Sequence, residues 1–282
     1  MMPATPEAEA ELDRLESILD GTLFHDPPID PWHGVLRDTA GNVVKPDDAA
    51  GDGRIYNVGP GQYNPAIRAN GQDWPATALT MIGTRRLRNV REVLLDVEKR
   101  GIEGDFMECG VWRGGASLYA LATIYAYQMK RRVILADSFQ GLPQEGEDIH
   151  HTFTALAVSQ EEVQGHFDAW IFGREHEQRL DQPPRALPPV LYVKGWFKDT
   201  LPGLDVKLAV LRADGDLYSS TMDILNGCYS KVINGGVIII DDYHAVPGCK
   251  KAVTEFHLLH NITDRLVEID GVGVYWTKGT AQ

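Results

Sequence analysis

The hydrophobic and polar positions divide the chain into two parts with different patterns. In the first part, residues 6–20 and 76–100 carry apolar residues at the three- and four-residue spacing of amphipathic helices. Between them, residues 25–75 are rich in Pro, Gly, Asp and Asn, a composition typical of loops. We therefore expect two helices, joined by a long irregular segment, ahead of the main body of the chain.

From residue 105 onward, short apolar runs alternate with helical segments. The runs are DFMECG, RRVILADS, VLYVKG, VKLAVLRAD and GGVIIIDDY. Strands that are apolar on both sides and alternate with helices are typical of a parallel sheet covered on both faces. The sequence predicts an α/β domain over residues 76–282, preceded by an N-terminal helix and loop over residues 1–75.

The loop over residues 25–75 also carries aromatic side chains, which disordered segments usually lack. They are Trp32, Tyr56, Tyr63 and Trp74. Long loops of this kind are usually functional or disordered. We interpret the segment as a lid that covers a substrate; a loop that is simply packed on the domain is the alternative.

Composition and charge narrow the class of function. The formal net charge is −13 and no run of Lys and Arg occurs, which argues against a nucleic-acid partner. Cys109, Cys228 and Cys249 form no C-x-x-C pair and fit reduced, buried thiols. The N-terminus is acidic without a continuous apolar stretch, so we expect neither a signal peptide nor a membrane anchor. These features favour a cytoplasmic protein that acts on small molecules.

Acids end four of the five apolar runs, at the edge of the sheet where ligands bind in such folds. The residues at the five ends are Glu108, Asp137, Gly195 with Trp196, Asp214 to Asp216, and Asp241 with Asp242. These residues are the candidates for binding and catalysis.

The glycine turn after the first run, Gly110-x-x-x-Gly114-Gly115, lacks the G-x-G-x-x-G spacing of dinucleotide sites. Glu108 would repel a phosphate but can accept hydrogen bonds from an ammonium group, and Asp137 can accept them from a ribose diol. A ribose joined to an aminoacyl cation describes S-adenosylmethionine. We predict that this turn and both acids bind that cofactor; a purely structural turn is the alternative.

Two neighbouring residues are candidates for the same cofactor. Ser117 begins the helix after the glycines, where its hydroxyl suits the cofactor's carboxylate, although helix capping also explains it. Trp196, next to Gly195, suits the adenine ring, and packing in the core is the alternative.

Asp214, Asp241 and Asp242 stand at the ends of two strands joined by one crossover helix, so we expect them side by side. Clustered carboxylates repel one another, and a divalent cation resolves that repulsion. Ligation by oxygen favours Mg²⁺, with Mn²⁺ or Ca²⁺ as substitutes. The sequence predicts a magnesium site on these acids; ion pairs with Lys or Arg are the alternative.

If the acceptor of the methyl group is an alcohol, as the family resemblance described below implies, transfer needs a metal to acidify the hydroxyl, a base to take its proton, or both. Asp216 is the candidate base, and an additional metal ligand is its alternative role. His244 and the pair His150–His151 are further candidates, although loop histidines are more often polar surface.

Five segments, in this order, resemble the macrocin O-methyltransferase family: FMECGVWRGGAS, ADSFQGLP, KGWFKDTLP, RADGDLYSSTMDIL and GGVIIIDDYH. The family methylates hydroxyls on deoxysugars of macrolides, aminocoumarins and related natural products, using S-adenosylmethionine and a divalent metal. The resemblance implies a class I methyltransferase fold, which is a Rossmann-like, mostly parallel seven-stranded sheet with helices on both faces.

The resemblance also assigns roles. It maps the family's metal-binding acids onto Asp214, Asp241 and Asp242, and the segment that closes over the cofactor onto ATALTMIG, with Met81 and Ile82. The implied acceptor is a glycosylated secondary metabolite of antibiotic biosynthesis. Residues 171–190 look like an insertion, and the first 70 residues resemble nothing in the family, so the acceptor's identity stays open.

Other functions fit parts of the pattern. The D-x-D triplet Asp214-Gly215-Asp216 is of the kind that metal-dependent glycosyltransferases use for a sugar nucleotide, but Glu108 and Asp137 would meet a diphosphate unfavourably. A catechol-type acceptor suits the same metal acids. A non-catalytic protein on this fold would be expected to lose some of the strand-end acids. The apolar face of the first helix can pack on the domain or on a second subunit, and we expect a homo-oligomer.

Overall fold

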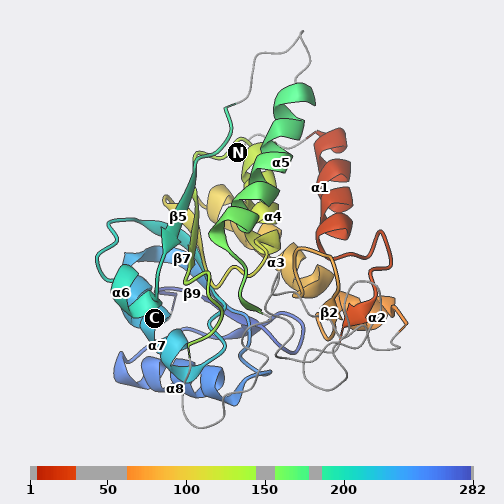
Figure 1. The fold of residues 1–282 in the computed structure, drawn as a ribbon. Coiled ribbons are helices and arrows are strands. Elements are labelled where there is room, and N and C mark those ends of the chain that lie inside the picture. The colour runs from red at the N-terminus through yellow and green to blue at the C-terminus, as the bar shows by residue number, and fades with distance from the viewer. Residues whose placement is uncertain (1–4, 30–61, 144–155, 178–185, 281–282) are drawn as a thin grey trace.

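A computed structural model describes residues 5–29, 62–143, 156–177 and 186–280 of the chain. Its centre is a seven-stranded sheet with the strand order β5-β4-β3-β6-β7-β9-β8. Figure 1 shows β5, β7 and β9 of this sheet between the helices. The strands are β3 (Asp105–Cys109), β4 (Val133–Asp137), β5 (Val190–Lys194), β6 (Leu208–Ala213), β7 (Val232–Ile240), β8 (Val267–Glu268) and β9 (Val274–Thr277). β9 runs antiparallel to β7 and β8, and the other pairs are parallel. The predicted mostly parallel sheet is confirmed.

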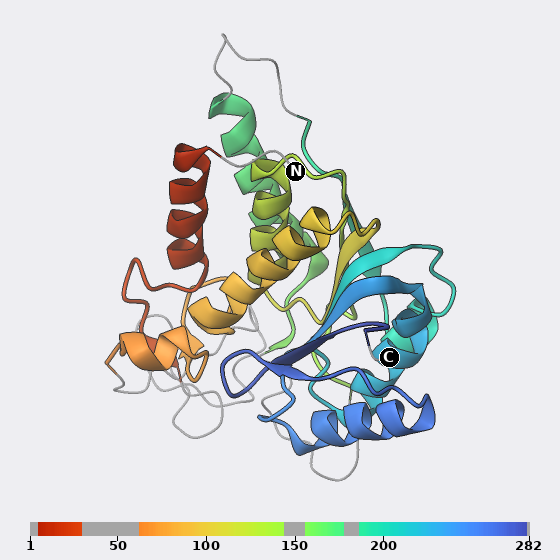
Figure 2. The same cartoon turned by 180° about the vertical axis from the view of Figure 1, so that it is seen from behind.

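Helices lie on both sides of this sheet (Figures 1 and 2). One side carries α1 (Pro6–Leu19), α3 (Gly83–Lys99), α4 (Gly115–Ala126) and α5 (Gln160–Glu177), and the other carries α6 (Phe197–Thr200), α7 (Tyr218–Cys228) and α8 (Pro247–Leu259). Successive strand residues point to opposite faces, so Phe106 packs in the first core and Met107 in the second. The sheet is buried on both faces, which is why its strands read as continuous apolar runs.

Helix α1 is the helix expected over residues 6–20. The Thr5 side chain caps it by accepting a backbone N–H, and a proline follows at the first helical position. Leu12 and Leu19 are buried in the core that α3 and α4 share. Glu16 is buried as well and pairs with Arg88 of α3 at 2.9 Å. The first helix is therefore packed on the α/β body by both apolar contacts and an ion pair.

The described part of residues 25–75 contains short elements rather than loop alone. They are β1 (Pro28–Ile29), α2 (Pro65–Ala69) and β2 (Trp74–Pro75), with β1 and β2 paired antiparallel. Residues 30–61 of the predicted lid, with Trp32 and Tyr56, lie outside the described residues.

A buried arginine fixes this segment to the body. Arg68 of α2 has no exposed surface, and its guanidinium donates hydrogen bonds to the backbone carbonyls of Asp20 and Asp26 at 2.8 Å. The same guanidinium donates to both carboxylate oxygens of Asp73, at 2.6 and 3.0 Å. Because Asp20 and Asp26 follow α1, the guanidinium joins two segments far apart in sequence.

The helix expected over residues 76–100 begins later than expected, at Gly83, so residues 76–82 are not helical. The backbone N–H groups of Leu79 and Thr80 donate to the carbonyl of Leu19, and the Leu79 carbonyl accepts from Gly115. Because these groups bond to other parts of the protein, they are not available to a helical turn. We call residues 71–82, which run from α2 to α3, the roof segment.

Helix α5 continues through Glu177 into the region that resembles an insertion, and residues 178–185 of that region lie outside the described residues. Within the described ranges, no helix is long and apolar enough to cross a membrane.

Candidate active site

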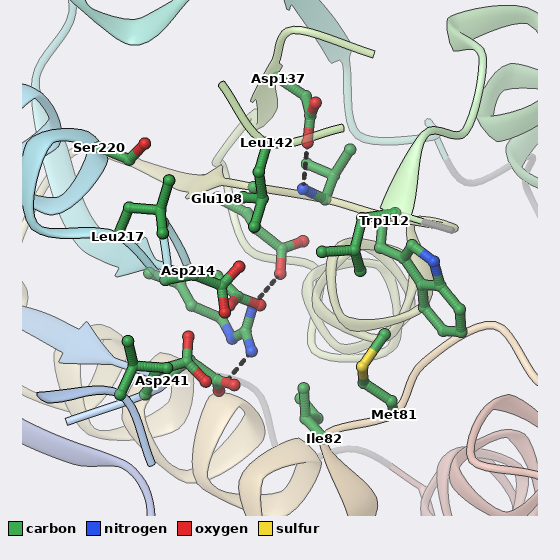
Figure 3. Close-up of a pocket in the computed structure, with 18 of the residues that line it drawn as sticks. Met81, Ile82, Glu108, Trp112, Asp137, Leu142, Asp214, Leu217, Ser220 and Asp241 are labelled. Atoms are coloured by element: carbon green, nitrogen blue, oxygen red, sulfur yellow. Dashed lines mark hydrogen bonds and ion pairs between the residues drawn. The ribbon is translucent and has the colours of Figure 1, made fainter. Parts of the chain in front are cut away.

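A cavity of about 910 Å³ opens at the carboxyl ends of the parallel strands. Its wall includes the ends of β3, β4, β6 and β7 and, from the roof segment, Gly71, Trp74 and Leu79 to Ile82. Figure 3 shows Glu108, Asp137, Asp214 and Asp241 around this space, with Met81 and Trp112 together at one end. The predicted residues that line it are Met81, Ile82, Glu108, Gly110, Asp137, Trp196, Asp214, Asp216, Asp241 and Asp242.

Gly110 allows the ends of two strands to approach closely. Its φ is +87°, and a Cβ built there would lie 2.9 Å from the carbonyl carbon of Asp214 and closer still to its oxygen. Its N–H donates to the Ala136 carbonyl at 2.9 Å, and the Asp214 N–H donates to the Cys109 carbonyl at 2.8 Å. The glycine therefore holds β3 beside the strand that carries Asp214.

Three predicted cofactor residues are absent from the cavity wall, and the structure gives each another role. Gly114 has a φ of +83°, and a Cβ there would meet Val163 of α5 at 2.9 Å, so this glycine makes room for helix packing. The Gly195 N–H donates to the Asp137 carbonyl at 2.9 Å. Ser117 is fully buried, and its hydroxyl donates to Glu108 instead of projecting into the cavity.

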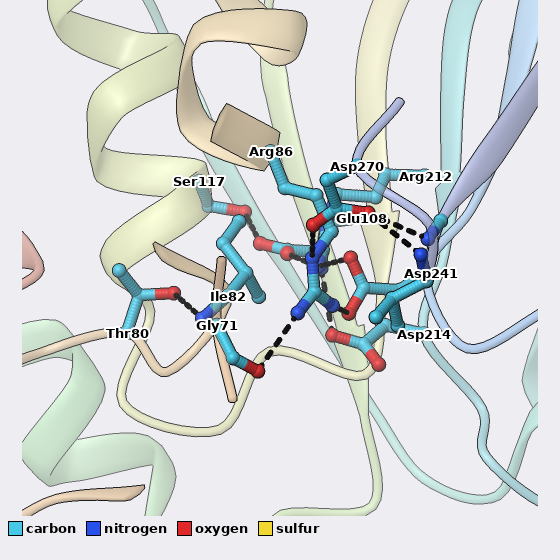
Figure 4. Close-up of polar contacts among 12 residues, drawn as sticks. Gly71, Thr80, Ile82, Arg86, Glu108, Ser117, Arg212, Asp214, Asp241 and Asp270 are labelled. Atoms are coloured by element: carbon cyan, nitrogen blue, oxygen red, sulfur yellow. Dashed lines mark hydrogen bonds and ion pairs between the residues drawn. The ribbon is translucent and has the colours of Figure 1, made fainter. Parts of the chain in front are cut away.

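Glu108 is held from two sides. Ser117 donates to one carboxylate oxygen, and Nη1 of Arg212 donates to the other (Figure 4). Burial raises the pKa of Glu108 to about 7, while the charge of Arg212 and the hydrogen bond from Ser117 oppose that rise. The sequence predicted a carboxylate reserved for the cofactor, whereas in the structure it also neutralises a buried arginine.

Asp137 organises the turn around the glycines. One oxygen accepts the backbone N–H of Val111 and the other accepts that of Phe139, both at 2.7 Å. These bonds place the carboxylate at the cavity wall in a fixed orientation, which suits recognition of a diol but also serves the turn itself.

Two tryptophans at the cavity were not among the predicted site residues. Trp74 of β2 and Trp112 meet edge to face with ring centroids 6.2 Å apart, and both line the cavity. Trp112 has a φ of +45°, which is uncommon for a bulky residue and marks a constrained backbone. The guanidinium carbon of Arg113 lies 4.1 Å from the centre of the Trp112 ring. Trp112 lies inside FMECGVWRGG, beside the glycine turn, and its position there could have marked it as a site residue.

Three carboxylates converge on the other side of the cavity. One oxygen from each of Asp214, Asp216 and Asp242 lies within 4.8 Å of the others. Burial and the neighbouring acids raise the pKa of Asp216 to about 7 and that of Asp242 well above its ordinary value. Asp242 Oδ2 is buried and has no hydrogen-bond partner among the described residues. A divalent cation fits this group, because it would satisfy the free oxygen and offset the repulsion.

Asp241 is not a member of that cluster, although the sequence predicted it there. Its oxygens accept from Nη1 of Arg86 and Nη2 of Arg212. Burial alone would raise the pKa of Asp241, but the two guanidinium groups lower it below its ordinary value. Ion pairing with arginine, the alternative to a metal site, therefore describes Asp241. Asp214 belongs to the carboxylate cluster and also contacts Arg212 at 2.8 Å.

The sequence reasoning missed both arginines. Arg212 is fully buried within β6, and Arg86 of α3 also contacts Asp270 at 3.0 Å. An arginine inside the apolar run VKLAVLRAD, two residues before Asp214 and so on the same face of the strand, was the signal for the first.

The histidine candidates lie elsewhere. His244 pairs with Glu268 at 2.9 Å, with about a third of its side chain exposed, and is absent from the cavity wall. His150 and His151 lie outside the described residues.

Comparisons with known proteins identify the family of the chain. Residues 12–278 match the family described as Macrocin-O-methyltransferase (TylF). The chain is 44% identical over 227 residues to demethyldecarbamoylnovobiocin O-methyltransferase of Streptomyces niveus, covering 77% of this chain and 82% of that protein. It is 36% identical to 8-demethyl-8-(2,3-dimethoxy-alpha-L-rhamnosyl)-tetracenomycin-C 4'-O-methyltransferase of Streptomyces olivaceus, covering 96% and 93%. The solved structure of the O-methyltransferase NovP superposes with a TM-score of 0.76 at 37% identity, over 96% of this chain and 99% of that one.

Proposed function

Because the chain belongs to the macrocin O-methyltransferase family, we propose that it methylates a sugar hydroxyl of a glycosylated antibiotic precursor, with S-adenosylmethionine as donor and a divalent cation as cofactor. That the chain is an O-methyltransferase follows from its relatives. The names of those relatives refer to antibiotics, and one names a rhamnosyl group, which supports a glycosylated acceptor for this chain.

The observation that carries the proposal is that the acidic cluster and the glycine turn line one cavity. Asp214 links them directly, since its backbone lies against Gly110 while its side chain belongs to the cluster. A donor held at the turn and an acceptor held at the cluster would therefore meet in one space, as an in-line transfer requires.

Asp214 and Asp242 are the proposed cation ligands, because both the sequence and the geometry select them. The family resemblance makes Asp241 the third; it lies outside the group of three clustered oxygens and accepts from Arg86 and Arg212, but each of its oxygens keeps a second lone pair. When bound, the cation would supply Lewis acidity that lowers the pKa of an alcohol. The chain's own part is to hold these carboxylates close together in a half-buried site.

Asp216 is the proposed base. Its carboxylate lies within 4.8 Å of the ligand oxygens of Asp214 and Asp242, so it is close enough to take a proton from a hydroxyl held there. Its φ of +52° turns the residue after Gly215 into the cavity wall. The competing role, a third ligand in place of Asp241, is tested below.

The donor would lie between the glycine turn and α6. Glu108, Asp137 and Trp196 line that part of the wall, and Met81 with Ile82 covers it from the roof segment. S-adenosylmethionine would supply an electrophilic methyl group on a positively charged sulfur. Acids around this space stabilise such a cation, and they oppose the diphosphate that a glycosyltransferase would bind.

The same charges favour a neutral acceptor. Among the described wall residues the basic side chains are Arg86, Arg212 and Lys198, and the two arginines are already engaged by carboxylates. A sugar linked to a nucleoside diphosphate would thus find little positive charge here. A hydroxyl on an uncharged glycoside meets no such repulsion.

The test is calorimetric titration of S-adenosylhomocysteine and of Mg²⁺ into the protein, with UDP as a control, followed by methyl-transfer assays on glycosylated acceptors and on a catechol. Binding of S-adenosylhomocysteine without UDP binding supports the donor assignment, and loss of transfer in EDTA that Mg²⁺ restores supports the cation. Turnover that persists fully in EDTA would remove the cation from the proposal. Preference for the catechol would remove the sugar.

Two asparagine variants separate the roles of the acids. Asp216→Asn should weaken Mg²⁺ binding by no more than about tenfold, through loss of one neighbouring charge, while losing turnover, because a base is lost and no ligand. Asp242→Asn should lose Mg²⁺ affinity and turnover together. Loss of Mg²⁺ binding in Asp216→Asn would instead make Asp216 a ligand.

The homo-oligomer also stays a proposal, although the apolar face of α1 that led to it packs on α3 and α4 of the same chain; light scattering of the purified protein tests it.

A further inference from the structure

Arg86 occupies an unusual position in the site, because one guanidinium joins three separate segments of the cavity wall. Nη1 donates to Asp241 at the end of β7, Nε donates to Asp270 at 3.0 Å, and Nη2 donates to the carbonyl of Gly71 at 3.2 Å. Figure 4 shows these contacts spreading from the guanidinium in different directions. The arginine's side chain is 6% exposed, so water does not replace these partners readily.

Each partner of Arg86 belongs to a different functional part. Gly71 begins the roof segment, which contains Met81 and Ile82. Asp270 also accepts the backbone N–H groups of Val272 and Gly273 at 2.9 Å, so it shapes the turn before β9, and Val272 lines the cavity. Asp241 is one of the acids proposed to hold the cation. Arg86 is therefore the point at which the roof, this turn and the acidic cluster meet.

We propose that Arg86 is a positioning residue for methyl transfer: its planar fork fixes the roof segment relative to the acidic cluster, and its charge weakens the hold of the cluster on the cation. The inference rests on the proposed function, since it takes a divalent cation at the cluster and transfer in the cavity below the roof.

The first half of the proposal follows from the shape of the side chain. A guanidinium presents its N–H groups in a rigid plane and can reach three acceptors at once, whereas a lysine ammonium acts as a compact point charge. Lysine at this position would keep the charge but could not bridge Asp241, Asp270 and Gly71 in the same way. The geometry of the roof should therefore depend on arginine itself.

The second half follows from charge. Arg86 and the cation compete for the same carboxylate, because Nη1 of Arg86 occupies Asp241 Oδ2. Removing the guanidinium removes a positive charge from beside the cluster and frees that oxygen, and both changes favour a cation. A residue that merely stabilised the fold would have the opposite effect, because its loss would loosen the cluster and weaken cation binding.

Three variants separate these effects. Arg86→Gln removes both fork and charge, Arg86→Lys removes only the fork, and Arg85→Gln is the matched control, since Arg85 is the preceding residue of α3 and is exposed. Mg²⁺ and S-adenosylhomocysteine binding are measured by calorimetry, and kcat is measured with the best acceptor. S-adenosylhomocysteine affinity also reports whether each variant is folded.

For Arg86→Gln we expect Mg²⁺ to bind tighter, on the order of tenfold, because one repelling charge is gone. Its kcat should fall on the order of a hundredfold, the effect of a small misplacement of reacting groups. For Arg86→Lys we expect Mg²⁺ affinity near that of the wild type with a similar fall in kcat. S-adenosylhomocysteine affinity should fall less than kcat in both, because Arg86 does not contact Glu108, Asp137 or Trp196 and affects the donor only through the cover by Met81 and Ile82.

Weaker Mg²⁺ binding in Arg86→Gln, or a kcat equal to that of Arg85→Gln, would overturn the proposal. If Arg86→Gln does not fold, Arg86→Lys decides: wild-type turnover contradicts the role of the fork, and slow turnover with unchanged Mg²⁺ affinity supports it. A wild-type protein that binds neither Mg²⁺ nor S-adenosylhomocysteine would instead refute the proposed function.

Discussion

Replacing Gly110 by alanine tests whether the glycine turn exists to bring two strand ends together. The turn carries Gly110 at a φ of +87°, against the backbone of Asp214. An alanine Cβ would enter the space of the Asp214 carbonyl group, where a neighbouring backbone, unlike a flexible side chain, cannot swing aside. β3 and β6 would have to separate.

The size of the effect can be worked from the structure. A left-handed conformation costs a residue with a Cβ about 1 to 2 kcal/mol. Relief of the overlap strains the backbone by a further ~1 to 3 kcal/mol, and the hydrogen bonds flanking the contact, Gly110 N–H to Ala136 and Asp214 N–H to Cys109, contribute about 1 kcal/mol each. We expect Gly110→Ala to lower the free energy of unfolding by about 4 to 7 kcal/mol.

Gly101→Ala is the matched control. Gly101 also has a positive φ, +68°, but a Cβ there would meet nothing within 4 Å, so only the conformational cost of about 1 to 2 kcal/mol remains. Urea unfolding of both variants measures the difference, and titration with Mg²⁺ reports whether Asp214 has moved. If Gly110→Ala lost no more stability than Gly101→Ala, the close approach of β3 and β6 would be wrong.

Two further predictions concern charged and titratable groups away from the glycine turn. Arg212→Met should lower the free energy of unfolding by about 3 to 5 kcal/mol in urea titrations, because it leaves buried acids unpaired. The control is Arg132→Gln, at a pair whose arginine is 45% exposed, which should cost less than about 1 kcal/mol. Similar losses in the two variants would contradict the buried network. Burial lowers the pKa of His257, so as pH falls through 6.5 the unfolded chain binds more protons than the folded protein and the folded protein loses stability. His257→Phe removes this loss, so its stability relative to wild type should rise as the pH is lowered from 8 to 5.5. A stability difference between the two proteins that does not depend on pH would refute this.

Much of the fold could be predicted because it depends on local pattern. The apolar runs match the strands of a sheet buried on both faces, and the N-terminal helix begins where Thr5 and the following proline cap it. The start of α3 was wrong because apolar spacing over residues 76–82 looks helical. In the structure, the N–H groups of Leu79 and Thr80 donate to the Leu19 carbonyl, and the Leu79 carbonyl accepts from Gly115. These partners are distant in sequence, so no local pattern predicts them.

In the site, too, the features set by local pattern could be predicted and those set by long-range packing could not. Strand ends could be located from sequence, so Glu108, Asp137 and the acids after β6 and β7 were found at the cavity. Which acids pair with which cations depends on packing between distant elements. Arg86 donates to Asp241 across 155 positions of sequence, and Asp241 is not among the three clustered carboxylates. Gly114 and Ser117 likewise support the wall from behind, because helix packing decides which side of a turn faces the ligand.

The network of arginines and acids is better explained by function than by stability. Replacing a buried ion-pair network with apolar residues of similar volume is often neutral or stabilising, so such a network is weak evidence for a stabilising role. Here the carboxyl groups also outnumber the guanidinium groups, and an oxygen of Asp242 is left without a partner among the described residues. An excess of carboxyl groups is unfavourable for the empty protein, where burial and mutual repulsion raise their pKa values, but it suits a divalent cation and a sulfonium cofactor. The two arginines reduce that excess while leaving the cluster acidic, which is the balance expected of a site that must bind cations and also fold before they arrive.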